Sequence, residues 1–154
     1  MSKHLKFRRL KKSDWKGVFQ YGSNPEVTKY LNWEPFQNES EAKQAVSLLK
    51  ARKGHIFSIL VYGEFAGVGS LFIQNDEKKL IQPEVILDQK FWGMGVGNEA
   101  LMQILRLSTA WYKGYTLYSK IHSNNEAGNA LFKKGGFKKV KKQKEFILYE
   151  MKIL

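Results

Sequence analysis

The sequence predicts a single α+β domain in which a mixed, mostly antiparallel sheet of about seven strands is flanked by helices. Segments with strand-like alternation first follow one another as neighbours and later alternate with helical segments. The chain has 154 residues with 43% hydrophobic and 14% aromatic side chains, enough to bury a substantial core in one domain over residues 1–154. It shows no internal repeat and no low-complexity linker, and it contains only three prolines.

The first third of the chain is predicted to form one strand and three helices. Asparagine, serine and proline residues stand where helices begin, because a polar cap accepts a free N–H group and proline fits the first helical position. The expected elements are a strand at 5–10, a helix capped by Ser13, a helix from Asn24-Pro25 to about Leu31, and a helix from the capping box Asn38-x-x-Glu41 to near Gly54.

The remaining chain is predicted to contain six strands and two helices. Two apolar strands at 56–62 and 65–74 flank a turn at Tyr62-Gly63-Glu64, and a third strand covers about 81–88. Next come a helix to about Lys113, a strand at 115–123, a helix capped by Asn124 or Asn125 that ends at Gly135-Gly136, and a strand pair at 137–140 and 146–153. The buried face of the longer helix is expected to carry Leu101, Ile104, Leu105, Ser108 and either Trp111 or Tyr112.

Three alternating glycines, Gly93, Gly95 and Gly97, lie between the third of these strands and the longer helix. Glycine allows positive φ and a close approach to the backbone, and the first turn of a helix carries N–H groups without an intrahelical partner. Together with the positive end of the helix dipole these groups suit a diphosphate. A tight strand-to-helix turn that needs only small residues is the alternative explanation.

Composition narrows the possible chemistry. The chain has no cysteine, and His4, His55 and His122 are far apart, so neither a thiolate nucleophile nor a metal site is expected. The start of the chain lacks the apolar region of a signal peptide, and no apolar stretch is long enough to span a membrane, which favours a cytoplasmic protein. The net charge of +12 favours anionic partners. Many lysines gather in the last third, where they form either a solvated face or a functional patch.

Three separated segments resemble the GNAT superfamily of acetyl-CoA-dependent N-acetyltransferases, most closely the branch that acetylates ribosomal-protein N-termini. The superfamily's loop, Gln/Arg-x-x-Gly-x-Gly/Ala, corresponds to Trp92-Gly93-Met94-Gly95-Val96-Gly97. Its Asn-x-x-Ser and Lys-Leu-Gly-Phe signatures correspond to Asn125-Glu126-Ala127-Gly128 and Lys134-Gly135-Gly136-Phe137. The segment from Ser23 to Pro35, with Tyr30-Leu31-Asn32-Trp33, is similar to the region between the family's first strand and its substrate-facing helices. A Rossmann dinucleotide site does not fit, because Asn98 occupies its third glycine position.

The resemblance implies a coenzyme A site. The backbone N–H groups of the loop would hold the diphosphate, the strand at 85–87 would pair with the pantetheine arm, and an amide near Val85 would polarise the thioester carbonyl. Asn125 would cap its helix and contact the cofactor. The implied cofactor-binding residues are Val85, Ile86, Leu87, Trp92, Gly93, Met94, Gly95, Val96, Gly97, Asn98 and Asn125.

The catalytic assignments depart from the family pattern. Gln82 stands where the family often has a glutamate, and Glu84, two residues further on the same strand face, is the candidate base. A charged residue at a strand edge is the alternative reading of Glu84. No tyrosine occurs between Asn124 and Phe137, and Gly128 replaces the serine of the branch, which leaves water, Ser123 or a tyrosine from elsewhere as the proton donor. Tyr30 and Trp33 are expected to face the acceptor, or else to pack helices onto the sheet.

The resemblance therefore implies transfer of acetyl from acetyl-CoA to a primary amine. An α-amine is the expected acceptor, because at pH 7 it loses its proton far more readily than a lysine amine does. A polyamine, an amino sugar or an antibiotic is an alternative acceptor. A basic RNA- or ribosome-binding module with the same fold and little turnover is the alternative function. The expected partners are acetyl-CoA, an amine-bearing acceptor such as a protein N-terminus, and a second copy of the chain in a homodimer, with neither a membrane nor a nucleic acid among them.

Overall fold

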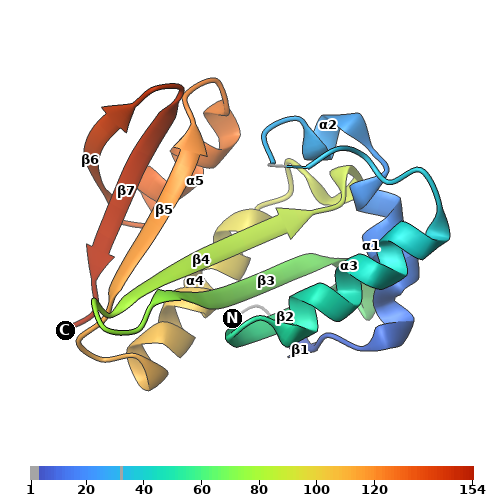
Figure 1. The fold of residues 1–154 in the computed structure, drawn as a ribbon, viewed down its shortest axis with the longest axis horizontal. Helices are drawn as coiled ribbons and strands as arrows, with labels where there is room; N and C mark the ends of the chain where they lie inside the picture. The colour runs from blue at the N-terminus through green and yellow to red at the C-terminus, as the bar shows by residue number, and fades with distance from the viewer. Residues whose placement is uncertain (1–3, 32) are drawn as a thin grey trace.

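The computed structural model describes residues 4–31 and 33–154 and contains one seven-stranded sheet (Figure 1). Asn32 of the family-like segment and residues 1–3 lie outside the described part. The strand order is β1-β2-β3-β4-β5-β7-β6, and every neighbouring pair is antiparallel except β4 and β5. The strands are β1 (Leu5–Arg9), β2 (Gly54–Val61), β3 (Glu64–Asn75), β4 (Leu80–Leu87), β5 (Thr116–His122), β6 (Lys138–Gln143) and β7 (Phe146–Lys152).

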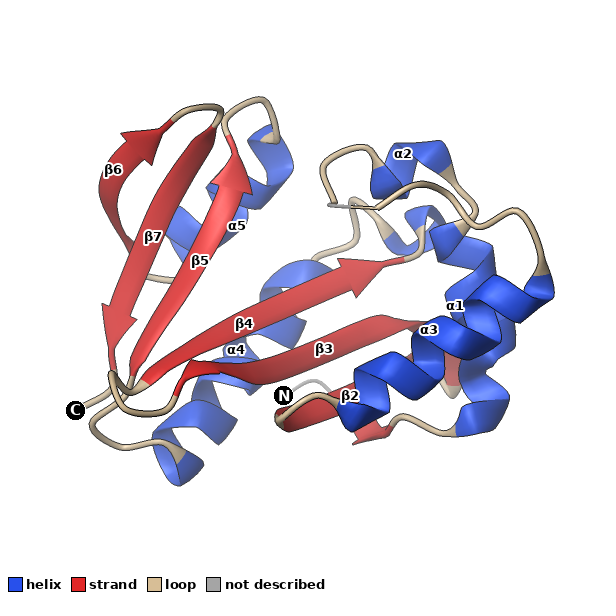
Figure 2. Ribbon diagram, viewed as in Figure 1, coloured by secondary structure: helices blue, strands red, loops and turns tan. Residues whose placement is uncertain are grey.

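Helices lie on both sides of the sheet (Figure 2). In this view α1 and α3 lie in front of β2 to β4, whereas α4 and α5 lie behind the sheet. The helices are α1 (Trp15–Gly22), α2 (Pro25–Thr28), α3 (Glu39–Ala51), α4 (Val96–Trp111) and α5 (Glu126–Lys134). The predicted fold class is therefore confirmed.

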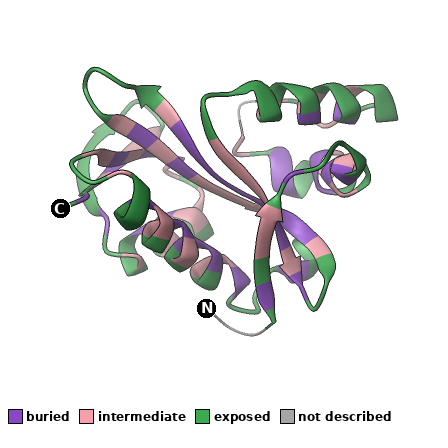
Figure 3. Cartoon of the chain, turned by 90° about the horizontal axis from the view of Figure 1, so that it is seen from below, coloured by how far each residue is buried: buried purple, intermediate pink, exposed green. Residues whose placement is uncertain are grey.

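Each helix layer has its own apolar core, and Figure 3 shows buried residues along the central strands and on the helix faces. The core behind the sheet includes Leu71, Ile81 and Leu117 from three strands and Leu101 and Ile104 from α4. The core in front of the sheet joins Val18 and Tyr21 of α1 to Val46 of α3 and Val68 of β3. The two layers fix β4 firmly on both of its faces.

The sheet opens between β4 and β5. These two parallel strands pair only at their first residues, Leu80 with Thr116 and Ile81 with Leu117. Beyond this point they diverge, and Figure 1 shows the gap between them as a V. The facing edges of the two strands therefore lie apart over most of their length.

The start of α1 differs from the prediction because Asp14, not Ser13, controls it. Lys12–Asp14 form a short 3-10 turn, and α1 begins at Trp15. The Asp14 carboxylate, which is 8% exposed, accepts hydrogen bonds from the Lys11 N–H at 2.8 Å and from the Ser58 hydroxyl at 2.7 Å.

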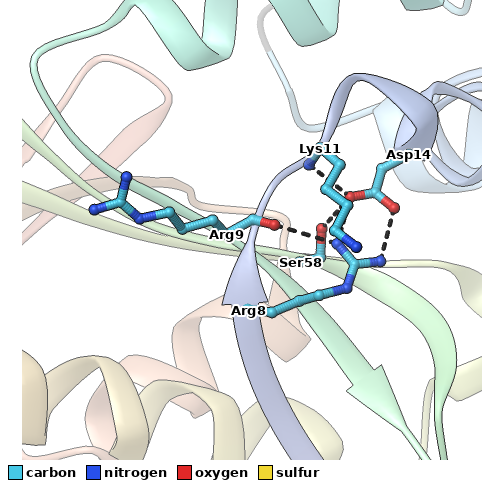
Figure 4. A network of polar contacts seen from close by, with 5 residues as sticks. All are labelled: Arg8, Arg9, Lys11, Asp14 and Ser58. Atoms are coloured by element: carbon cyan, nitrogen blue, oxygen red, sulfur yellow. Dashed lines mark hydrogen bonds and ion pairs between the residues drawn. The ribbon is translucent and has the colours of Figure 1, made fainter.

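Arg8 completes this network by donating to both carboxylate oxygens of Asp14, at 2.7 and 2.9 Å (Figure 4). These hydrogen bonds outweigh the cost of burying the charge and lower the pKa of Asp14 to about 2. The network joins β1, β2 and the entry to α1.

Two further details of the helices differ from the prediction, and one alternative that the prediction left open is decided. Helix α2 ends at Thr28, before the expected Leu31, and the chain turns there with the Leu31 N–H bonded to the Thr28 carbonyl. Asn38 caps α3 through the Glu41 N–H as expected, but the Glu41 carboxylate accepts from the Gln37 N–H instead of completing the capping box. Trp111 is 48% exposed, and Tyr112 takes the core position at the end of α4.

Candidate active site

A cleft with a volume of about 860 Å³ opens where β4 and β5 diverge. The end of β4, the glycine loop, α2 and one face of α5 form its walls, so segments that are far apart in the sequence meet there. Its lining includes the predicted residues Tyr30, Val85, Ile86, Leu87, Trp92, Gly93, Gly95, Val96, Gly97, Asn98 and Asn125. The volume lies within the usual range of about 300–1,000 Å³ for small-molecule sites.

The glycine loop has the backbone geometry of an anion cradle. Gly93 and Gly95 both have positive φ, at 75° and 78°, and Gly95 is the N-cap of α4. The first N–H group of this helix with a backbone acceptor is that of Glu99, which bonds to the Gly95 carbonyl at 3.2 Å. The N–H groups of the preceding turn are therefore available to a ligand. A Cβ atom on Gly93 or Gly95 would have nothing within 4 Å, so the conformation and not crowding requires glycine there.

Trp92 fixes this loop to the end of β4, because its indole N–H donates to the Leu87 carbonyl at 3.0 Å. On β4, Val85 and Leu87 pack against the layer of α4, whereas Ile86 packs against the layer of α1. All three residues reach the cleft through the edge of the strand that faces β5. Met94 is 61% exposed and lies outside the lining residues.

The opposite wall is the first turn of α5, which a buried polar network holds in place. Asn125 caps the helix by accepting from the Gly128 N–H at 2.9 Å. The buried Asn129 side chain donates to the carbonyls of His122 and Asn125 and accepts from the Tyr149 hydroxyl at 2.5 Å. The network joins α5 to β5 and β7, so it sets the width of the cleft on this side.

Three aromatic rings contact one another beside the cleft, and one of them, that of Tyr30, lines it. The Tyr30 ring, from the segment after α2, stacks on His122 at the end of β5 with centroids 5.2 Å apart. His122 also meets Phe146 edge to face at 5.7 Å, and its Nδ1 accepts from the Asn124 N–H at 3.1 Å. These contacts join the segment after α2 to β5 and β7 at the end where β4 and β5 are apart.

Comparison with known proteins decides the family. Residues 4–138 match the model of the acetyltransferase (GNAT) domain. The chain belongs to the GNAT family. A curated relative, an uncharacterised N-acetyltransferase named p20 from Bacillus licheniformis, is 26% identical over 110 residues. This match covers 68% of the GNAT chain described here and 62% of the relative, so the chain spans less than two thirds of that protein.

Several solved GNAT structures share the fold. The RimL ribosomal L7/L12 α-N-protein acetyltransferase in complex with coenzyme A has a TM-score of 0.87 at 20% identity, covering 99% of this chain and 96% of that one. An acetyltransferase from Salmonella typhimurium that modifies the N-terminal serine of L7/L12 has a TM-score of 0.84 at 19% identity, covering 99% and 97%. Spermidine N-acetyltransferase from Vibrio cholerae, in complex with CoA and spermine, has a TM-score of 0.81 at 15% identity, covering 97% and 95%.

The GNAT fold places the candidate base beside the cleft and not in its lining. Glu84 is half-buried on the face of β4 that carries Ile86, directly opposite Ser70 of β3. Burial raises the pKa of Glu84, an effect that Arg52 opposes. The Ser70 hydroxyl is buried and has no hydrogen-bond partner in the described part of the chain, and burial together with Glu84 raises the pKa of Tyr21. Burial thus shifts the pKa of Glu84 toward neutrality, beside the cleft.

The structure does not bring two other predicted residues into the lining of the GNAT cleft. Trp33 packs against Phe36, with ring centroids 4.8 Å apart, in the core of the α1 layer. Ser123 follows β5, and its N–H bonds to the Glu145 carbonyl at 2.7 Å. Neither is among the lining residues.

Two lysines that line the cleft were not predicted from the sequence. Lys29 is the C-cap residue of α2, and Lys134 ends α5. Lys134 could have been found from helical spacing. One face of α5 lines the GNAT cleft, and its residues recur at intervals of three: Asn125, Gly128, Leu131 and Lys134. For the described residues no helix is long and apolar enough to cross a membrane, and no group of three or more His, Asp or Glu side chains could hold a metal ion.

Proposed function

We propose that the protein transfers an acetyl group from acetyl-CoA to a primary amine, and that its acceptor is the N-terminal amine of a protein or peptide. The observation that carries the proposal is the glycine loop at the start of α4, which opens onto a cleft bounded by an unpaired edge of β4. The loop offers amides to a diphosphate, and the strand edge offers amides and carbonyls to an extended arm. Both features match the shape and chemistry of coenzyme A.

Each part of the site has a defined task in this reaction. Acetyl-CoA supplies the acyl group as a thioester. The N–H groups of Val96, Gly97 and Asn98 hold the diphosphate, and the backbone of residues 85–87 orients the arm. An N–H donor near Val85 that reaches the developing oxyanion would contribute about 3 kcal/mol to the acyl-transfer step.

Glu84 is the proposed base that accepts a proton from the acceptor amine, directly or through water. Its side chain lies on the same sheet face as that of Ile86, which lines the cleft, so a bridging water would connect Glu84 with the acceptor amine. Burial raises its pKa, which moves a carboxyl toward the range in which general bases work near neutral pH. A thiol pKa of about 8.5 makes coenzyme A a tolerable leaving group, so Ser123 is not required as an acid.

An N-terminal amine suits the acceptor side better than a polyamine. A polyamine carries several positive charges and needs several unpaired carboxylates. The carboxylates in the cleft lining are those of Glu26, which pairs with Lys29 at 3.3 Å, and Glu126. The rest of the lining is neutral apart from Lys29 and Lys134, and it includes the Tyr30 ring. An uncharged α-amine fits this environment, because it needs only one proton acceptor.

The test is a panel of acceptors with acetyl-CoA, read by thiol release and by mass spectrometry of the product. We expect acetylation of peptides with a free N-terminus and little with spermidine or with a peptide that is blocked at its N-terminus and contains lysine. A preference for spermidine or for the lysine amine would refute the choice of acceptor. A thermal-shift titration provides the control for the donor, since a ligand at 100 times its Kd stabilises the folded state by about 2.7 kcal/mol.

A further inference from the structure

One face of the β5-β7-β6 half of the sheet is not covered by a helix. Helix α5 packs behind these strands, on the side of Leu117, Tyr149 and Phe132. In front of them Figure 2 shows neither a helix nor a strand. Residues that oppose one another in register share a face, so the register of β5, β7 and β6 identifies the side chains on this open face.

The open face is basic. Its exposed charged residues are Lys120 on β5, Lys152 on β7, and Lys138 and Lys141 on β6. The single carboxylate on this face is Glu150, opposite Lys138. None of the four lysines lies within 4.0 Å of a carboxylate in the described part of the chain. The charges of this face are therefore not neutralised by the protein itself.

The packing of Leu148 indicates how these lysines are held. Leu148 lies on the open face between Lys120 and Lys141, its register partners on β5 and β6, and is only 3% exposed. With no helix in front of it, the aliphatic stems of these lysines and the Tyr118 ring, which lies on the same face, are the groups placed to cover it. The ammonium groups of the four lysines then form a row at the exposed surface of the face.

This row leads to the mouth of the cleft. The same face continues through Phe146 to His122, which are register partners, and His122 stacks on Tyr30 in the cleft lining. A chain that lies along the open face therefore arrives with one end at the place where β4 and β5 diverge. Strand β6 also has a free edge, which offers backbone hydrogen bonds to an extended segment.

We infer that the open face of β5, β7 and β6 is the docking surface for an acidic, extended polypeptide whose N-terminus enters the cleft past Tyr30 and His122. The inference rests on the proposed function and specifies the chemistry of its acceptor: carboxylates downstream of the acetylated amine. An acidic peptide fits better than single-stranded RNA. RNA sites combine positive charge with exposed aromatic platforms, whereas the ring among the lysines of this face, that of Tyr118 opposite Glu150, is half-buried. The free edge of β6 suits an extended peptide.

The experiment compares two peptides with the same first residues, followed by a run of glutamates in one and of glutamines in the other. Two double variants of β6 with equal charge change are assayed. Lys138→Glu with Lys141→Glu alters the open face, whereas Lys139→Glu with Lys142→Glu alters the opposite face of the same strand, where these residues oppose Tyr149 and Ile147.

At low salt we expect the parent protein to prefer the glutamate peptide by about tenfold in kcat/KM, since each exposed ion pair changes an equilibrium constant by about a few fold. The preference should shrink with added salt. The open-face variant should lose it and keep its rate on the glutamine peptide, and the opposite-face variant should retain most of it. Circular dichroism and the acetyl-CoA thermal shift verify that both variants fold and bind the donor.

Three results would overturn the inference. The first is equal loss of the preference in both variants, which would make it an effect of net charge alone. The second is acetylation of both peptides at equal rates by the parent protein. The third is binding of a labelled single-stranded RNA that only the open-face variant loses, with no binding of the labelled glutamate peptide. Acetylation of neither peptide, with normal binding of the labelled glutamate peptide, would refute the proposed function and leave the docking surface supported.

Discussion

Gly95 can be changed to alanine without a steric clash, so this substitution tests the backbone conformation of the glycine loop alone. A Cβ at this position would meet no atom within 4 Å, but the residue has φ of 78°. A non-glycine residue in this region costs about 1–2 kcal/mol. For a chain of this size we therefore expect Gly95→Ala to lower Tm by about 2–8 °C.

We expect Gly95→Ala to have a larger effect on the binding of acetyl-CoA. If the loop relaxes away from positive φ, the N–H groups at the start of α4 no longer converge on the diphosphate. Loss of one charge-assisted hydrogen bond, worth about 1.5–3 kcal/mol, raises KM for acetyl-CoA by about 10- to 150-fold. The assay is thiol release at varied acetyl-CoA, together with the thermal shift that acetyl-CoA produces.

Gly63 provides the matched control. It lies in the turn between β2 and β3 with φ of 80°, and a Cβ there would also meet nothing within 4 Å. Gly63→Ala should cost the same stability and leave KM for acetyl-CoA unchanged. If the two variants bind acetyl-CoA equally well, the loop does not hold the diphosphate and the reasoning fails.

Two further predictions concern carboxyl groups with shifted pKa values. The pKa of Asp14 is lowered from 3.8 to about 2 in the folded protein, so its contribution of about 2 kcal/mol to the free energy of unfolding is present above pH 4 and is lost as the pH falls toward 2. Chemical denaturation of Asp14→Asn should show lower stability at pH 7 and a smaller loss of stability between pH 4 and pH 2. An unchanged stability at pH 7 would contradict the role of the network. The pKa of Glu84 is raised by burial, so ionisation of Glu84 makes the folded protein less stable as the pH rises above 4.5. The variant Glu84→Gln should therefore be more stable at pH 7, but its kcat should be about 10²- to 10⁴-fold lower and its pH–rate profile should lack the acidic limb. An unaltered pH–rate profile would exclude Glu84 as the base.

Most of the fold could be predicted from the sequence because the local signals for helices, strands and turns agreed with one another. Alternation located β1, and two apolar runs around the turn at Tyr62-Gly63-Glu64 located β2 and β3. Gly114 and the Asn125 cap separated β5 from its neighbouring helices. The main errors occurred where a distant residue decides a local structure. Ser13 is a reasonable cap by itself, but Arg8 and Ser58 bind Asp14 and move the helix start. The lysine-rich β6 extends to Gln143, beyond the predicted 140, because pairing with β7 outweighs the low strand preference of lysine.

In the candidate site, too, features formed by neighbouring residues could be predicted and contacts between distant residues could not. The glycine loop was predictable, since a strand, small residues and a helix start are consecutive in the chain. The contact of Tyr30 with His122 was not, because it joins segments about ninety residues apart across the sheet. Trp33 and Phe36 are aromatic residues that follow α2 as Tyr30 does, and only the packing of the α1 layer shows that they face the core.

The short pairing of β4 with β5 gives this sheet its weakest line at its centre, where most sheets are strongest. Only two residue pairs join the strands there, so in hydrogen exchange the inner edges should behave like the rim of a sheet, and β1 to β4 can open as one cooperative unit and β5 to β7 as another. An acyl donor that lies between them would bond both units together. Release of the product would then loosen the centre of the molecule while both of its outer parts stay folded.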